Sequence, residues 1–161
     1  MALINLKTAD QLKPQVQRIL GQVFAQLEAL LPEAELHHIG ATAIPGALTK
    51  GDVDVLVRVP GARFQVVVDR LKRHFTIKQP ANWTPEFASF GDDTSFELPL
   101  GIQVLVKDAK DDVLLFLRDY FISHRYALAE YNRLKMTHAA EGSEGYWKAK
   151  DKFLAEILVS R

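Results

Sequence analysis

The sequence predicts an α+β protein, in which a small mixed β-sheet is flanked by helices and followed by a helical C-terminal third. Three observations lead to this prediction. Apolar residues between positions 16 and 31 recur every three or four positions, as on one face of a helix. Valines alternate with other residues from Val53 to Val59, as in a strand with one buried face. Helical spacing returns after residue 111 and continues towards the C-terminus.

Proline and glycine residues set the expected element boundaries in the first half of the chain. Pro14 suits the first turn of a helix, where its missing N–H needs no partner, and Pro32 ends that helix. Pro60 and Gly61 turn the chain after a β-rich segment. The expected elements are, in order, a helix to residue 31, a strand over 34–39, a loop over 40–49, a strand over 52–59 and a helix over 64–75.

The second half is expected to complete the sheet and then become helical. Asp111 is a suitable N-cap for the first of three helices, because a short side-chain oxygen can accept from the free N–H groups there. The glycine-containing run 142–145 is expected to separate the last two helices. The expected elements are strands over 76–79, 88–90, 94–98 and 101–106, and helices after residue 111, after residue 123 and over 146–159.

Length and composition fit one globular domain over residues 1–161, as a monomer or homodimer. The chain is 48% hydrophobic and 25% charged, as is usual for globular proteins. Twenty basic residues balance twenty acidic ones, so no net field draws the chain to nucleic acid or to an anionic membrane. Nucleic acid is therefore not an expected partner.

The absence of certain sequence features excludes several kinds of site. Without cysteine, the chain can form no disulfide, no thiolate zinc site and no cysteine nucleophile. The N-terminal residues do not have the pattern of a secretory leader. No window approaches the roughly 18 uninterrupted apolar residues of a membrane span. A cytoplasmic protein with no membrane partner is expected.

Asp52 and Asp54 are the strongest candidates for chemistry. Side chains at i and i+2 of a strand share one face, with Cα atoms roughly 6.5–7 Å apart. Two carboxylates held this close repel each other unless a cation or strong donors lie between them. The pair therefore suggests a site for a divalent metal and phosphate. The alternative is an exposed sheet face, continued by Leu56 and Arg58.

The glycine turn ahead of these aspartates is a candidate anion site. Backbone amides of Gly40, Ala41 and Thr42 can cradle a phosphate, although a tight loop needing glycine for its dihedral angles explains the same residues. His37 and His38 are neighbours on a strand, so at most one of them faces the same cleft. A structural, hydrogen-bonded histidine is the more common outcome.

Two separated blocks of the sequence resemble the GrpB family of the nucleotidyltransferase superfamily. The first is His-Ile-Gly-Ala-Thr-Ala-Ile-Pro-Gly at 38–46, followed by Lys50 and the strand that carries Asp52 and Asp54. The resemblance covers nearly the whole chain. The second block comprises Arg118-Asp119-Tyr120, Tyr131, Leu134-Lys135, Tyr146, Lys150 and Phe153.

The resemblance implies a nucleotidyltransferase-like fold and a nucleotide site. Asp52 and Asp54 would be catalytic and would bind Mg²⁺ or Mn²⁺. The turn at Gly40, Ala41 and Thr42 would hold the phosphates of a nucleoside triphosphate, and the acceptor is not identified. Lysines that can reach these phosphates are Lys50, Lys135 and Lys150. The alternatives are a solvated loop lysine at 50 and, at 135 and 150, lysines whose stems cover the core.

Two departures from the family pattern favour a second interpretation. Ala41 replaces the serine of the family's Gly-Ser turn, with Thr42 next to it. The segment 101–106 carries Gln103 but neither a carboxylate nor a histidine, whereas active relatives take a third carboxylate from a later strand. The alternative function is therefore a catalytically silent module that binds a nucleotide or small molecule. An RNA-associated enzyme is a third possibility, which the neutral net charge disfavours.

Overall fold

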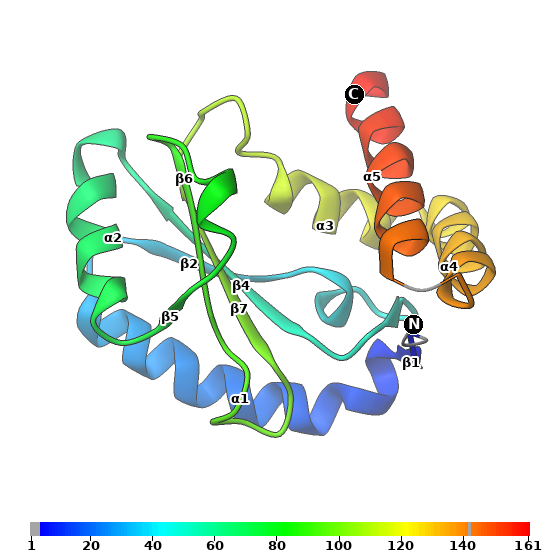
Figure 1. Ribbon diagram of the computed structural model, residues 1–161, viewed down its shortest axis with the longest axis horizontal. Coiled ribbons are helices and arrows are strands. Elements are labelled where there is room, and N and C mark those ends of the chain that lie inside the picture. Colours follow the sequence, from blue (N-terminus) through cyan, green and yellow to red (C-terminus); the bar gives the residue numbers. More distant parts are fainter. Residues whose placement is uncertain (1–3, 142) are drawn as a thin grey trace.

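The computed structural model describes residues 4–141 and 143–161 and confirms the predicted α+β fold class (Figure 1). A five-stranded sheet has the order β2-β4-β7-β6-β5, with β4 and β7 parallel and the other neighbours antiparallel. A two-stranded sheet pairs β1 with β3. The strands are β1 (Lys7–Thr8), β2 (Glu35–Ile39), β3 (Leu48–Thr49), β4 (Val53–Val59), β5 (Thr76–Ile77), β6 (Phe87–Asp92) and β7 (Leu100–Val106).

In the part of the chain that the structure describes, five α-helices either cover the sheet or form the C-terminal third. They are α1 (Ala9–Leu30), α2 (Phe64–Lys72), α3 (Leu114–Ser123), α4 (Arg125–Ala139) and α5 (Ser143–Ser160). Single 3₁₀ turns lie at Ala41–Ala43, Gly61–Arg63 and Pro80–Asn82. Within the ranges that the structure describes, no helix combines the length and apolar character of a membrane span.

The alternation of β4 gives the sheet two different faces. The valines at 53, 55, 57 and 59 are fully buried and pack against α1 and α2, in the main hydrophobic core. Burial of each such side chain contributes about 1.5–3 kcal/mol. Asp54, Leu56 and Arg58 point to the opposite face, where α3 covers Leu56. Helices α4 and α5 pack beside α3 and the 41–47 segment, away from the sheet centre (Figure 1).

Helix α1 begins earlier than predicted, at Ala9. Thr8 caps it: its hydroxyl accepts from the Gln11 amide N–H at 3.2 Å, and the Gln11 side chain accepts from the Thr8 N–H at 2.9 Å. This capping box satisfies two free donors and fixes the start. The prediction that Pro14 marks the first turn was wrong, because Pro14 lies inside the helix.

The predicted strand over 94–98 is absent, and this segment forms a bend between β6 and β7. The Asp92 side chain accepts hydrogen bonds from the amides of Thr94 and Ser95, at 3.1 and 2.9 Å, which holds the bend. Glu97 forms an ion pair with Arg18 at 2.9 Å. Side-chain hydrogen bonds of this kind compete with strand pairing.

Two predicted helix boundaries also differ. Asp111 is not the N-cap of α3, since Val113 occupies that position and no side chain caps it. Helix α5 begins at Ser143, so the break expected over 142–145 does not extend to Glu144 or Gly145. Gly142 itself lies outside the described residues.

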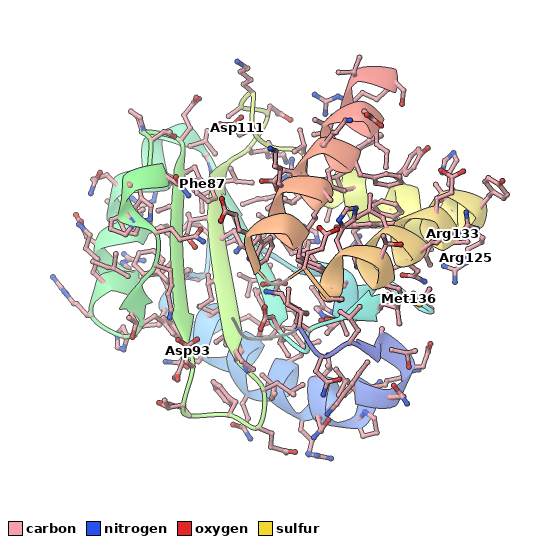
Figure 2. All side chains as sticks on the ribbon, turned by 45° about the vertical axis from the view of Figure 1, so that its right-hand side comes forward. Phe87, Asp93, Asp111, Arg125, Arg133 and Met136 are labelled. Atoms are coloured by element: carbon pink, nitrogen blue, oxygen red, sulfur yellow. The ribbon has the colours of Figure 1, made fainter. Side chains whose placement is uncertain are left out.

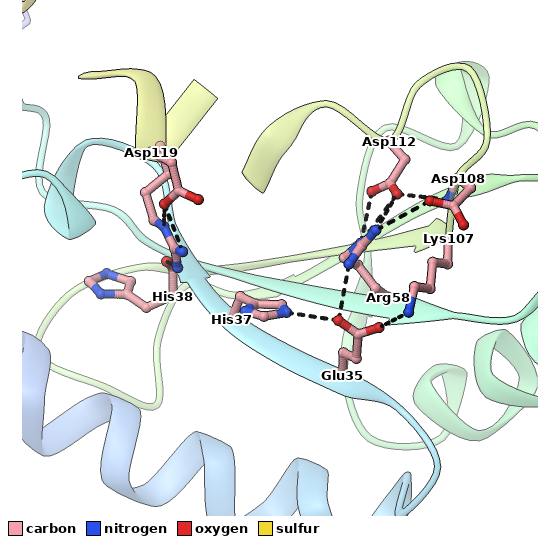
Figure 3. A network of polar contacts seen from close by, with 9 residues as sticks. Glu35, His37, His38, Arg58, Lys107, Asp108, Asp112 and Asp119 are labelled. Carbon is pink, nitrogen blue, oxygen red and sulfur yellow. Dashed lines mark hydrogen bonds and ion pairs between the residues drawn. The ribbon is translucent and has the colours of Figure 1, made fainter. Parts of the chain in front are cut away.

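Arg58 joins β4 to β2 and to the segment before α3 (Figure 3). Its guanidinium binds Asp112 with the shortest contact at 2.7 Å and Glu35 at 3.0 Å. Glu35 also contacts Lys107 at 3.0 Å and His37 at 3.2 Å. The hydrogen bond from Lys107, then that from His37, lowers the pKa of Glu35 to about 2. The exposed-face interpretation of Arg58 was therefore wrong.

We expect Arg58→Met to lower the free energy of unfolding by about 3 kcal/mol, since a buried ion pair that loses one partner leaves an uncompensated charge. The abandoned partner is Asp112, whose side chain is only 4% exposed. Urea unfolding at neutral pH measures the change. Arg73→Met, at an exposed position after α2, is the control and should change stability little. Equal stability of the two variants would contradict the importance of the network.

Candidate active site

A cavity of about 560 Å³ lies between the sheet and the C-terminal helices. Phe87, at the start of β6, and Asp93, directly after its end, line this cavity, and Figure 2 labels both. The fold brings together most of the site residues suggested by the sequence. Those that line the cavity are Gly40, Ala41, Lys50, Asp52, Asp54, Lys135 and Lys150. Thr42 is not among the lining residues.

Asp54 occupies a slot between two glycines. It lies opposite Gly101 in the β4–β7 register and opposite Ile39 at the end of β2, just before Gly40. A Cβ atom on Gly40 would lie 2.5 Å from Asp54 Oδ2, and one on Gly101 would lie 2.7 Å from Oδ1. Gly40 also has a φ of 75°, which glycine adopts without strain. Both glycines are therefore required for the position of this carboxylate.

The environment of Asp54 disfavours its negative charge. Burial, and secondarily the Asp52 carboxylate, raises the pKa of Asp54 to about 6, while Lys150 and Lys50 oppose this rise. Within the described ranges, no side chain hydrogen-bonds to this carboxylate or pairs with it within 4.0 Å. Asp54 therefore remains largely ionised at neutral pH, at an energetic cost that a bound cation would reduce.

Asp52 directly precedes β4 and faces the same cavity. Its Oδ2 lies 3.4 Å from Lys50 Nζ, and the Asp52 side chain is 39% exposed. The Lys50 ammonium also lies 4.0 Å from the centre of the Trp147 ring, in a cation–π contact. Lys50 is thus held between the acidic side of the cavity and α5, so it is not a freely solvated loop lysine.

Thr42 has a structural role in this conformation. Its hydroxyl donates to the Asp52 carbonyl oxygen at 3.2 Å and lies 2.9 Å from His38 Nε2. Burial, followed by the charge of Arg118, lowers the pKa of His38 to about 4, so the imidazole is neutral and its Nε2–H donates to Thr42. In this conformation the Thr42 hydroxyl is therefore engaged within the protein and does not take the place of the serine hydroxyl that Ala41 lacks. Neither His37 nor His38 lines the cavity.

Lys135 and Lys150 bring positive charge from α4 and α5. Lys135 is 2% exposed, donates to the Leu48 carbonyl oxygen at 2.6 Å and lies 4.1 Å from the Tyr131 ring centre. Burial, and then Lys150, lowers the pKa of Lys135 to about 7. Burial also lowers the pKa of Lys150, which neighbouring Asp54 partly offsets. Lys135 faces the cavity and does not extend to solvent, in contrast to the core-covering alternative.

Several residues that shape the cavity were not predicted from sequence. Gly101 carries a signal, because a glycine within a strand often marks a close approach of another group. Trp147 contacts both Lys50 and Lys150, at 4.0 and 4.5 Å from its ring centre, but its spacing on α5 does not distinguish it from a core aromatic. Other unpredicted lining residues are Ser89, Arg118 and Tyr146.

The two carboxylates that line the cavity, those of Asp52 and Asp54, fit a divalent cation only if a phosphate group supplies further ligands. Among residues 4–141 and 143–161, no group of three or more histidine, cysteine, aspartate or glutamate side chains is placed to hold a metal. Mg²⁺ typically binds one or two carboxylates and completes its shell with substrate phosphates and water. Asp52 and Asp54 satisfy this smaller requirement. An all-protein metal cage is not supported.

Known proteins resemble this chain in sequence and in fold, over nearly its full length. The family model described as GrpB protein matches residues 7–160. The UPF0157 protein VC_A0354 of Vibrio cholerae is 29% identical over 155 residues, covering 93% of this chain and 79% of that protein. The crystal structure of GrpB from Enterococcus faecalis has a TM-score of 0.65 at 16% identity, covering 89% of this chain and 94% of that chain.

Structures of the Cid1 poly(U) polymerase show the same fold in a larger protein. The MgGTP-bound form has a TM-score of 0.57 at 13% identity and covers 80% of this chain. This chain spans only 42% of that one. At such low identity, the likeness establishes a nucleotidyltransferase-like fold and nothing about activity.

Proposed function

Because this chain belongs to the GrpB family, whose fold is nucleotidyltransferase-like, we propose that its cavity binds a nucleoside triphosphate with Mg²⁺ or Mn²⁺ and transfers a nucleotidyl group to an acceptor. The observation that carries this proposal is the buried Asp54 carboxylate, which lines the cavity together with Asp52 and three lysines. The Cid1 structures bound to MgGTP and MgATP provide a precedent for such a ligand on this fold.

The carboxylates form the acidic side of the proposed site. Asp52 and Asp54 would hold the divalent cation, which supplies charge neutralisation at the phosphates when it is bound. Asp54 is already placed by Gly40 and Gly101, so it needs no rearrangement to serve as a ligand. Fixed charges of this kind are effective because they require little reorganisation during the reaction.

Lys50, Lys135 and Lys150 supply the positive charge of the proposed site. Lys135 and Lys150 are partly desolvated, so a polyanion that enters the cavity would favour their protonated forms. Lys50 balances the charge of Asp52 and lies close enough to contact a phosphate at the same place. Together these side chains would orient the triphosphate across the cavity, with Gly40 and Ala41 contributing backbone amides.

Isothermal titration calorimetry with ATP, GTP, CTP and UTP tests the proposal. We expect at least one nucleotide to bind in the presence of Mg²⁺ or Mn²⁺, and chelation of the metal to weaken binding. The double variant Asp52→Ala with Asp54→Ala should lose this binding, whereas Asp111→Ala, in an exposed loop, should retain it. The proposal fails if wild type binds none of the four, or if the double variant binds equally well.

A catalytically silent binding module remains the second candidate function. Gln103 is an amide beside Gly101, where it cannot act as a third carboxylate ligand. Ala41 has no hydroxyl, and the Thr42 hydroxyl is hydrogen-bonded to the Asp52 carbonyl. This candidate predicts nucleotide binding without turnover. Transfer of label from an α-³²P nucleotide to any acceptor would exclude it.

A further inference from the structure

The part of the cavity lined by Gln103 and Ser89, which we call the arm, is not assigned to the proposed nucleotide site. It lies over β7 and β6, where Gln103 and Ser89 are direct partners in the strand register and face the same side as Asp54. Gln103 Nε2 lies 3.7 Å from the position that a Cβ on Gly101 would occupy, and Asp54 Oδ1 lies 2.7 Å from the same position. The amide of Gln103 and the carboxylate of Asp54 therefore share the space above Gly101.

The polar groups in this arm are available to a ligand. Ser89 is only 5% exposed, yet among the described residues its hydroxyl forms no hydrogen bond, and the Gln103 amide forms none either. In the same part of the chain, no fully buried polar side-chain atom lacks a partner. The Ser89 and Gln103 groups must therefore be accessible from the cavity, which both residues line.

Two cationic side chains of the arm, Arg118 and Lys78, are already paired within the protein. Arg118 donates to the His38 carbonyl oxygen at 3.1 Å and to the Asp119 carboxylate at 2.9 Å. Lys78 forms an ion pair with Asp93. A phosphate group in this arm would have to compete with these partners for a cation. Apolar walls come from Phe87, Leu114 and Leu117.

We propose that the arm lined by Gln103 and Ser89 is the acceptor subsite, and that it takes a neutral, hydroxyl-rich molecule such as a single sugar or polyol. An amide and a hydroxyl can both donate to and accept from sugar hydroxyls, and the apolar walls suit the C–H faces of a sugar ring. A cavity of about 560 Å³ that also holds a nucleotide leaves room in this arm for one sugar-sized group. This inference rests on the proposed nucleotidyl transfer.

The position of the arm suits that transfer chemically. An acceptor hydroxyl held by Gln103 would lie next to Asp54, where the α-phosphate is expected. The acceptor oxygen forms a bond to the α-phosphorus, and the bond from this phosphorus to the oxygen bridging to the β-phosphate breaks. Pyrophosphate leaves with the electron pair of that bond, and the hydroxyl proton passes to solvent water.

Ligand-observed saturation-transfer NMR tests the subsite with defined probes. The probes are D-ribose, D-glucose, ribose 5-phosphate and glucose 6-phosphate, each measured with protein alone and with Mg²⁺ plus the four α,β-methylene nucleoside triphosphates. We expect the neutral sugars to bind and Gln103→Leu or Ser89→Ala to weaken them about tenfold or more, since loss of a hydrogen-bonding group discriminates strongly against a hydroxyl ligand. Gln22→Leu, at an exposed position on α1, is the matched control.

The outcomes separate the subsite from the proposed function. Nucleotide calorimetry on Ser89→Ala should match wild type, because Ser89 lies on β6, one strand further from Asp54 than Gln103 does. Absence of sugar binding, equal sugar binding by Gln103→Leu, or tighter binding of the sugar phosphates would overturn the subsite while leaving the nucleotide result intact. Absence of nucleotide binding would instead overturn the proposed function, and sugar binding sensitive to Gln103 would still support a sugar site in this arm.

Discussion

Replacing Asp54 with asparagine should abolish Mg²⁺-dependent nucleotide binding and, at the same time, make the folded protein more stable at neutral pH. The variant keeps the shape of the side chain in the slot between Gly40 and Gly101 but removes the negative charge that a metal requires. The same charge is unfavourable in the unliganded protein, because burial and Asp52 raise its pKa to about 6. Function and stability are therefore expected to change in opposite directions.

The pH dependence follows from the direction of this shift. The folded-state pKa lies above the ordinary value of 3.8, so between about pH 4 and pH 6 the folded state binds more protons than the unfolded state. The Asp54 contribution to stability therefore decreases as pH rises through this window. Asparagine removes this loss, giving a gain on the order of 3 kcal/mol near pH 7, in which the opposing attraction of Lys150 and Lys50 for the carboxylate is already included.

Urea unfolding of wild type and Asp54→Asn near pH 4 and near pH 7 measures the effect. The two proteins should differ little at the lower pH and most at the higher one. Asp111→Asn is the control, and because residue 111 is exposed it should change the free energy of unfolding little. A variant that is less stable than wild type near pH 7, or that retains metal-dependent nucleotide binding, would show that Asp54 does not have the assigned role.

If Asp54 binds the metal as proposed, Gly101→Ala should lower the affinity for nucleotide and Mg²⁺ by about a hundredfold or more, because displacement of this carboxylate removes a charge-assisted interaction. The added methyl group would lie 2.7 Å from Asp54 Oδ1. Real Cβ atoms essentially never come this close to another heavy atom. The other neighbouring atoms lie at 3.7 Å or beyond. The Asp54 carboxylate therefore has to move away from its present position beside Gly101.

A double-mutant cycle isolates this contact. The loss of stability caused by Gly101→Ala should largely disappear in an Asp54→Ala background, since the only close atom has been removed. Gly21→Ala is the matched control: no atom lies within 4 Å of the position that its added methyl group would occupy, and a helical glycine replaced by alanine should gain about 0.5–1 kcal/mol. An unchanged cost of Gly101→Ala in both backgrounds would mean that a contact other than the one with Asp54 explains it.

Much of the sheet could be predicted because strand alternation is a local property. The buried valines of β4 determine that Asp54 points to the opposite face, and the structure has this arrangement. Boundaries set by side-chain hydrogen bonds were harder to predict. Helix α1 begins at the Thr8 cap and not near Pro14. The hydrogen bonds of Asp92 hold a bend where a strand over 94–98 was predicted. Arg58 pairs with Asp112 and does not lie on an exposed face.

The candidate site was only partly predictable for a different reason. Asp52 and Asp54 are neighbours in sequence, so their common direction follows from the period of the strand. Lys135 and Lys150 reach the same cavity through the packing of α4 and α5, which no local pattern specifies. The resemblance to a family suggested these lysines, whereas Gly101 and Trp147 became apparent only from the three-dimensional contacts.

The attachment of α4 to the 45–48 segment has a consequence for the order of folding. Asn132 donates to the Gly46 carbonyl oxygen and accepts from the Leu48 amide, both at 2.9 Å, and Arg125 donates to the Pro45 carbonyl oxygen at 2.6 Å. These contacts join residues about 80 positions apart, and contacts over such sequence separations form slowly because a long loop must first close. We therefore expect a refolding chain to complete its sheet first and to acquire ligand-binding capacity in a later kinetic phase.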